Sequence, residues 1–166
     1  MLHVASTHPE IYFLFLTTDD FCREHLRQPR WLLSNTTRDA LNGTCPPNII
    51  HLNDRAVEKH DFIRACDAML HARREGETFG LAIAEFAVHN KPVITSNQSF
   101  PRWGALSAHT HVDILGSRGL YWYDAASLRA QLLSFDRARA QLGDWNAYRA
   151  FEPAAVMRRF AEVFLD

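Results

Sequence analysis

The residues best suited to chemistry in this chain are two glutamates, Glu77 and Glu85, with seven residues between them. Gly80 lies between them, just before an alanine-rich apolar segment that predicts a buried helix over residues 81–89. Glycine lets the backbone approach a ligand closely, and the first amide groups of a helix are unpaired donors suited to phosphate or sugar oxygens. Carboxylates are acceptors, whose natural partners are the hydroxyls of a sugar or a ribose. The spacing therefore predicts a site for a phosphate-bearing sugar.

A simpler interpretation stands beside this one, because acidic side chains near a helix N-terminus are favourable without any ligand. The spacing of the two glutamates does not by itself distinguish a ligand site from this simpler interpretation, since it arises by chance in about one chain in three. The surrounding block is more specific, because the loop and helix are framed by apolar runs at residues 67–71 and 91–95. Glu75 could replace Glu77 in a shifted alignment, but the Gly80-Leu81 junction argues against the shift.

The elements that must position this loop alternate along the chain. Short apolar runs predict strands at residues 11–16, 48–52, 67–71, 91–95, 111–115 and 120–123. Helices are expected over residues 55–66 with Asp54 as the cap, over 81–89, after Asp124, and from Pro153, where the last helix should bury Val156, Met157, Phe160, Ala161 and Phe164. This order predicts a single α/β domain over residues 1–166, with a Rossmann-like parallel sheet covered by helices on both faces and an irregular insertion at about residues 18–47.

Composition narrows the classes of partner. With 18 basic and 19 acidic residues, the chain has no field to attract nucleic acid or an anionic membrane, and its longest early apolar run, residues 11–16, is too short to span a bilayer. Three cysteines without metal-type spacing predict a reduced, cytoplasmic protein. His109 and His111 lie close together but lack a third ligand of suitable spacing, so no metal site is predicted.

The block from Asn48 to Ser96 resembles the donor-binding, C-terminal domain of GT-B glycosyltransferases of the retaining, Glu-x7-Glu type. The likeness rests on the Glu-Thr-Phe-Gly-Leu loop, the second glutamate and the strand Lys91-Pro92-Val93-Ile94-Thr95, with a looser likeness over most of the remaining chain. It implies a Rossmann-like half of a GT-B enzyme that binds a nucleotide-diphosphate sugar as its donor substrate. It also implies transfer of a hexose, with retention of configuration, to an acceptor such as a glycan, protein or lipid. The family needs no tightly held metal or other cofactor.

The resemblance also implies residue roles. Glu77 matches the glutamate that contacts the donor sugar and is the catalytic candidate, and Glu85 matches the glutamate that holds the ribose hydroxyls. Thr78, Phe79, Gly80 and Leu81 match the stretch that approaches the sugar and diphosphate, and Leu52 and Asn53 match the wall beside the base. Arg73 falls near the family's Ser-Arg position, but His71-Ala72 replaces the usual Pro-Ser and the loop is longer. Contact of Arg73 with phosphate and a surface ion pair are therefore equal alternatives.

The phosphate-binding Arg and Lys of the family are expected on a segment before Met1, and the acceptor-binding half is not found in these residues. Alone, the domain should bind donor weakly and transfer nothing, so we expect a separate acceptor-binding domain as a partner. The alternative is a non-catalytic nucleotide-sugar-binding module or remnant. A dinucleotide-dependent oxidoreductase ranks below both, because no Gly-x-Gly-x-x-Gly turn follows a strand.

Overall fold

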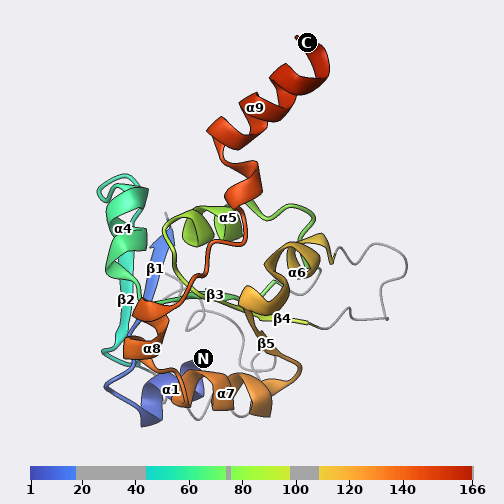
Figure 1. The fold of residues 1–166 in the computed structure, drawn as a ribbon. Helices are drawn as coiled ribbons and strands as arrows, with labels where there is room; N and C mark the ends of the chain where they lie inside the picture. Colours follow the sequence, from blue (N-terminus) through green and yellow to red (C-terminus); the bar gives the residue numbers. More distant parts are fainter. Residues whose placement is uncertain (18–43, 74–75, 98–108, 166) are drawn as a thin grey trace. The chain divides into compact units, whose positions relative to one another are not determined.

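The computed structural model describes residues 1–17, 44–73, 76–97 and 109–165, and these form an α/β fold (Figure 1). They divide into two compact units, Met1–Ala65 and Cys66–Asp166, which we describe separately. Most of the expected insertion at about residues 18–47 lies outside the described residues. The prediction of one domain over the whole chain stays a prediction.

The first unit is built on two parallel strands, β1 (Phe13–Thr17) and β2 (Ile49–Asn53), paired in the register Phe13↔Ile49. Helix α1 (Leu2–Thr7) precedes them, and its Leu2 packs with Met1, Cys45 and Ile49. Cys45 is disulfide-bonded, so the expectation that every cysteine is reduced is wrong there, whereas Cys66 in the second unit is a free thiol.

The helix of the first unit starts later than its sequence suggested. Asp54 was expected to cap a helix over residues 55–66, but α4 spans Lys59–Ala65. The reason is a turn at Asn53, whose side-chain oxygen accepts a hydrogen bond from the Arg55 amide at 2.9 Å and whose carbonyl accepts one from the Ala56 amide at 3.0 Å. Such a local bond competes with helix formation and postpones its start.

The second unit holds the predicted site and is built on a parallel sheet in the order β3 (Met69–His71), β4 (Val93–Ser96) and β5 (Gly119–Trp122). Helix α5 (Leu81–Val88) packs against β3 and β4, and α7 (Ala125–Leu133) packs against β5, on the opposite side of the sheet in Figure 1. Ile83, Ala87 and Val93 are fully buried in the core between helix and sheet. The prediction of parallel strands alternating with helices is confirmed at this level, although each sheet is small.

Local signals explain how two of these helices begin and end. Asp124 accepts a hydrogen bond from the Ser127 amide at 2.7 Å, and the Ser127 hydroxyl accepts one from the Asp124 amide at 2.9 Å, so a reciprocal capping box starts α7. Asn90, which directly follows the helix expected over residues 81–89, has a positive φ of 56°. Its side chain also bonds the Gly143 carbonyl and the Trp145 amide, which joins the end of α5 to a segment more than fifty residues away.

One predicted strand is wrong. Residues 111–115 were expected to be extended, but α6 spans Thr110–Leu115 and is followed by the 3₁₀ turn η3 (Gly116–Arg118). A run of five residues that mixes apolar and polar side chains does not separate helix from strand by periodicity. Asp113 in the first turn favours the helix through its dipole, and Gly116, at a φ of 50°, ends it.

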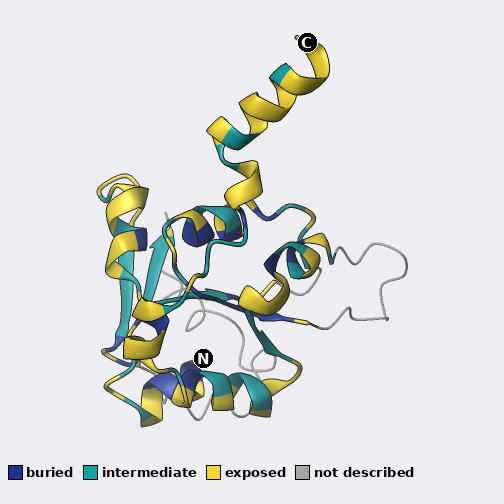
Figure 2. Ribbon diagram, viewed as in Figure 1, coloured by how far each residue is buried: buried dark blue, intermediate teal, exposed yellow. Residues whose placement is uncertain are grey.

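The C-terminal part of the second unit consists of α8 (Arg137–Leu142), the 3₁₀ turn η4 (Arg149–Phe151) and α9 (Pro153–Phe164). As predicted, α9 begins at Pro153. Its apolar stripe is exposed, however, with Phe164 at 71% (Figure 2), so the expectation that this helix buries Val156, Met157, Phe160 and Phe164 is wrong for the described residues. A helical period shows which residues share a face and leaves open what covers that face.

Candidate functional site

The predicted site lies where the sheet of the second unit leads into α5. Gly80 occupies the N-cap position of this helix with a φ of 73°, a left-handed conformation that favours glycine. Its carbonyl already accepts the first helical bond, from the Ala84 amide at 2.9 Å. No side chain among the described residues caps this end of α5, and Leu81 in the first turn is 73% exposed. Gly80 itself is buried, and the first amide groups of α5 form a positive helix end without a side-chain cap from the described residues.

Glu77 lies three residues before that end and forms an ion pair with Arg73. The Arg73 Nη1 to Glu77 Oε1 distance is 2.5 Å, with Glu77 mostly buried and Arg73 more than half exposed. Of the two alternatives for Arg73, the structure has the ion pair, while a contact with phosphate is not tested. Since ion pairs with an exposed partner contribute only about 0–1 kcal/mol, a ligand can displace Arg73 from the carboxylate at small cost.

Glu85 lies on the same face of α5 as the exposed Leu81. The face of α5 that packs inward carries Ile83, Phe86 and Ala87, all buried. Glu85 lies four residues after Leu81, and residues four apart share a helix face on which side chains lean toward the N-terminus. The half-buried Glu85 is therefore on the same side of the helix as the exposed first turn.

A chain of buried hydrogen bonds lies behind Glu77. His71 and Thr95 are register partners on β3 and β4, and His71 Nδ1 lies 2.9 Å from Thr95 Oγ1. Thr95 Oγ1 lies 3.4 Å from Nε2 of His111, on α6. His111 Nδ1 in turn lies 3.2 Å from the Glu77 amide nitrogen and 3.0 Å from the Glu77 carbonyl oxygen. Three side chains from three elements thus support the backbone of Glu77.

The other end of this chain points at the Glu77 carboxylate. His71 Nε2 is buried, lies 4.0 Å from Glu77 Oε1, and has no hydrogen-bond partner among the described residues. Burial, followed by the neighbouring His111 ring, lowers the pKa of His71 below its ordinary value of 6.5. His71 is therefore neutral at pH 7, with one protonated and one unprotonated ring nitrogen.

An aromatic cluster holds the loop at Phe79. The buried Tyr148 donates its hydroxyl to the Phe79 carbonyl at 2.6 Å, and its ring meets that of Phe79 edge-on at 5.2 Å. Phe151 packs edge-on against Phe79 at 5.0 Å. Burial, together with the charge of Glu77, raises the pKa of Tyr148 to about 12. The cluster anchors the loop one residue before Gly80, so the Phe79 carbonyl has a structural partner and is not open to a ligand.

The remaining predicted residues are distributed between the two units. Thr78 is exposed in the loop beside Glu77. Leu52 and Asn53 lie at the carboxyl end of β2 in the first unit, whereas Glu77 and its hydrogen-bond partners belong to the second unit. Parallel sheets bind ligands at the carboxyl ends of their strands, which is where all of these residues lie within their own sheets.

Sequence reasoning considered His71 as a strand-end residue that could either point into the donor site or satisfy a local hydrogen bond, and it missed the other residues that support the site. Tyr148 is 71 positions after Glu77, and no motif marks it. Thr95 was placed in a strand but not assigned to the site, and His111 was considered only as a weak metal ligand. The described residues contain no group of three or more His, Cys, Asp or Glu side chains that could hold a metal ion. Pairing of the strands expected at residues 67–71 and 91–95 was a sequence signal for Thr95, because it would have put Thr95 beside His71.

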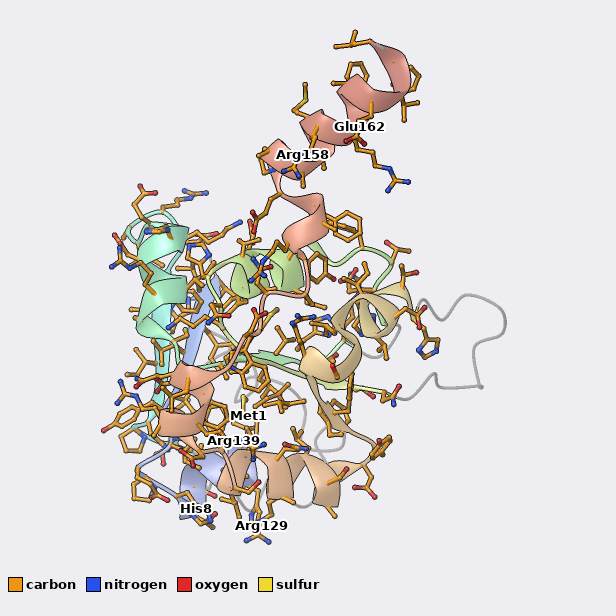
Figure 3. All side chains as sticks on the ribbon, in the orientation of Figure 1. Met1, His8, Arg129, Arg139, Arg158 and Glu162 are labelled. Atoms are coloured by element: carbon orange, nitrogen blue, oxygen red, sulfur yellow. The ribbon has the colours of Figure 1, made fainter. Side chains whose placement is uncertain are left out.

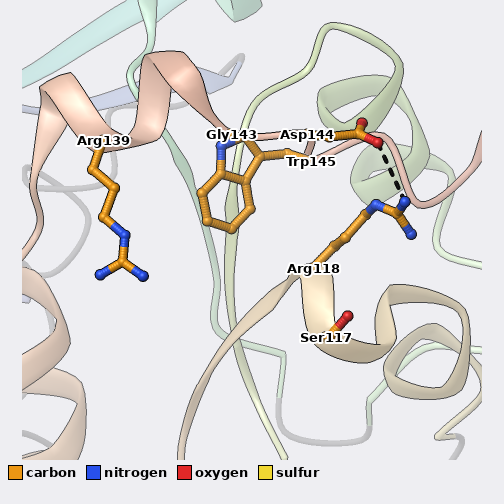
Figure 4. Close-up of a pocket in the computed structure, with 6 residues that line it drawn as sticks. All are labelled: Ser117, Arg118, Arg139, Gly143, Asp144 and Trp145. Atoms are coloured by element: carbon orange, nitrogen blue, oxygen red, sulfur yellow. Dashed lines mark hydrogen bonds and ion pairs between the residues drawn. The ribbon is translucent and has the colours of Figure 1, made fainter.

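A polar hollow in this unit is lined by none of the residues around Glu77 (Figure 4). Its lining includes Arg118, whose guanidinium bonds Asp144 at 3.2 Å. The same carboxylate bonds Arg149 at 3.2 Å, so two arginines share one acidic side chain, and Arg139 also lines the hollow. None of the predicted donor-site residues lines this hollow.

The chain matches no known protein family, no curated protein and no solved structure. None of the helices in the described ranges is both long and apolar enough to cross a membrane.

Proposed function

We propose that this chain is the nucleotide-sugar-binding domain of a retaining glycosyltransferase of the GT-B type. The observation that carries the proposal is the N-terminus of α5, which has no side-chain cap from the described residues and starts at a left-handed Gly80, with Glu77 before it and Glu85 one turn inside it. Amide donors at a positive helix end suit a diphosphate, and flanking carboxylates suit hydroxyls. A nucleotide-diphosphate sugar carries a diphosphate between two sets of hydroxyls, so its order of groups matches the order of these residues.

In this proposal each group has a separate role. Glu85 accepts hydrogen bonds from the ribose hydroxyls, and Glu77 accepts them from the sugar. The α5 amides stabilise the negative charge that develops on the departing diphosphate, which is the preorganised electrostatic effect that most lowers a reaction barrier. Thr78 and Leu81 border the sugar and diphosphate. Arg73, once displaced from Glu77, is an exposed cation available to the phosphates.

The acceptor, whether glycan, protein or lipid, is bound in this proposal by a separate domain. Transfer of a hexose therefore requires that partner, and binding of the donor does not. A cytoplasmic location is part of the proposal, and the disulfide at Cys45 is the observation that speaks against it, because such bonds are rare in reducing compartments.

Calorimetric titration with UDP, GDP, UDP-glucose and GDP-mannose tests the donor site. Loss of a hydrogen bond to a charged group costs about 1.5–3 kcal/mol, so Glu85→Ala should weaken nucleotide binding at least about tenfold. Glu77→Ala should weaken a nucleotide sugar more than its free nucleotide. Glu162→Ala, which removes a carboxylate on the exposed α9, is the matched control and should bind like the wild type (Figure 3).

Three results would count against the proposal. If the wild type bound none of the four compounds, the nucleotide-sugar site would be wrong. If Glu85→Ala bound nucleotide as well as the wild type does, the role of Glu85 would be wrong. Equal losses for nucleotide and nucleotide sugar in Glu77→Ala would remove the sugar contact from Glu77. Donor binding without transfer in the presence of an acceptor domain would favour the non-catalytic alternative.

A further inference from the structure

With both imidazoles taken as neutral, with one N–H each, two arrangements of the hydrogen-bond chain behind Glu77 use the Thr95 hydroxyl as a donor to one ring and an acceptor from the other. In the first direction the Glu77 amide donates to His111 Nδ1, His111 Nε2–H donates to Thr95, and the Thr95 hydroxyl donates to His71 Nδ1. His71 then carries its proton on Nε2. In the second direction every donor is reversed, starting with His111 Nδ1–H to the Glu77 carbonyl, and His71 Nε2 is left as a bare lone pair.

The Glu77 carboxylate selects between these directions. His71 Nε2 lies 4.0 Å from Glu77 Oε1. A proton on Nε2 faces the negative oxygen favourably, whereas a lone pair there would repel it, and both atoms are shielded enough from water for the difference to matter. At the other end of the chain neither direction is favoured over the other, since His111 Nδ1 lies near both the amide and the carbonyl of Glu77. The first direction is therefore preferred, with His71 as an N–H donor aimed at Glu77.

We propose that one hydroxyl of the donor sugar binds between His71 Nε2 and Glu77 Oε1, accepting a hydrogen bond from the imidazole and donating one to the carboxylate. The inference rests on the proposed nucleotide-sugar function and adds His71 to the site as a specificity-determining residue. An oxygen about 2.8 Å from both atoms fits a 4.0 Å separation. Only a group that donates and accepts through one atom satisfies both partners, so the pair selects a hydroxyl over hydrogen or fluorine.

Entry to this position depends on Arg73. Its guanidinium contacts Glu77 Oε1, the atom that lies 4.0 Å from His71 Nε2, so it lies near both partners. The arginine side chain is 57% exposed and can move into solvent. A sugar hydroxyl that replaces it gives Glu77 a new hydrogen bond and gives the buried His71 Nε2 its first one, which removes the cost of an unpaired buried donor.

Two substitutions of His71 separate the donor from the shape of the ring. His71→Gln can place an amide N–H near the position of Nε2, whereas His71→Phe keeps a ring without any donor. Titrations with UDP, GDP, UDP-glucose and GDP-mannose should show unchanged nucleotide affinity for both variants. The better-bound nucleotide sugar should weaken about threefold to tenfold with His71→Phe and less with His71→Gln. Removal of the selected hydroxyl from that sugar by deoxygenation should weaken the wild type more than His71→Phe, because the wild type loses the bonds to both His71 and Glu77, whereas His71→Phe loses only the bond to Glu77.

A measurement on the wild-type protein accompanies these titrations in case His71→Phe does not fold. Two-bond ¹H–¹⁵N correlation spectra distinguish the imidazole tautomers, and the His71 signals are those lost in His71→Gln. We expect the Nε2–H tautomer at pH 7, and the Nδ1–H tautomer would overturn the inference. So would a folded His71→Phe protein that binds the nucleotide sugar as tightly as the wild type while nucleotide binding persists. Failure of the wild type to bind any nucleotide would instead reject the proposed function, and this inference with it.

Discussion

Replacing Tyr148 by phenylalanine is a direct test of the anchor beneath the site loop. The tyrosine is 1% exposed and its hydroxyl donates to the Phe79 carbonyl at 2.6 Å. Phenylalanine keeps the ring and its contacts with Phe79 and Phe151, so the substitution removes little besides the hydrogen bond. A lost bond that leaves its partner unpaired costs about 1–2 kcal/mol, and we expect that decrease in the free energy of unfolding at pH 7.

The same substitution should change the response to alkali. Burial, followed by the charge of Glu77, raises the pKa of Tyr148 from the ordinary 10.0 to about 12 in the folded protein. Between these values the unfolded chain loses the proton while the folded chain keeps it. Wild-type stability should therefore fall by about 1.4 kcal/mol for each pH unit above 10, up to about 2.7 kcal/mol. Tyr148→Phe lacks this loss, so a deficit of about 1.5 kcal/mol at pH 7 should be cancelled near pH 11.

Urea unfolding of both proteins from pH 7 to pH 12 measures this crossing. Tyrosinate absorbance of the folded proteins, followed over the same range, should show a late titration step that Tyr148→Phe lacks. Tyr121→Phe is the control, because the pKa of Tyr121 is also raised by burial and its removal should leave the Tyr148 step in place. Unfolding curves of the wild type and Tyr148→Phe that stay parallel from pH 7 to pH 12 would refute the reasoning, since they would mean that Tyr148 titrates alike in both states.

Two further substitutions test the starts of helices. Gly80→Ala puts a side chain at a φ of 73°, with its Cβ 3.0 Å from Ile83 Cδ1. We therefore expect the free energy of unfolding, measured with urea, to fall by about 1–2 kcal/mol. An unchanged midpoint would show that α5 does not need this conformation. Hydrogen bonds from the amide and hydroxyl of Ser127 lower the pKa of Asp124, so its contribution should be present above the ordinary value of 3.8 and disappear as the pH falls through the lower folded value. Asp124→Asn keeps an oxygen for the cap but should flatten the acid limb of stability against pH, and identical limbs would contradict this.

Sequence patterns were sufficient where a structural decision depends on neighbours in the chain. A helix was expected after Asp124, which does cap α7, and a glycine before an apolar alanine-rich run predicts the start of α5. The stop at Asn90 follows in the same way from a residue that tolerates positive φ. Gly80 belongs to this group through its position at the N-cap of α5, and the roles of Glu77 and Glu85 in binding stay predictions.

The sequence by itself therefore determined the candidate ligand-binding loop, while tertiary structure alone decided what supports it. His71 meets Thr95 because two strands pair in one register, and His111 joins them because residues 110–115 form a helix that local periodicity did not distinguish from a strand. Tyr148 reaches Phe79 across 69 positions. Such contacts depend on how segments far apart in the sequence pack together and satisfy one another's buried hydrogen-bonding groups. A short-range sequence pattern does not identify those distant partners.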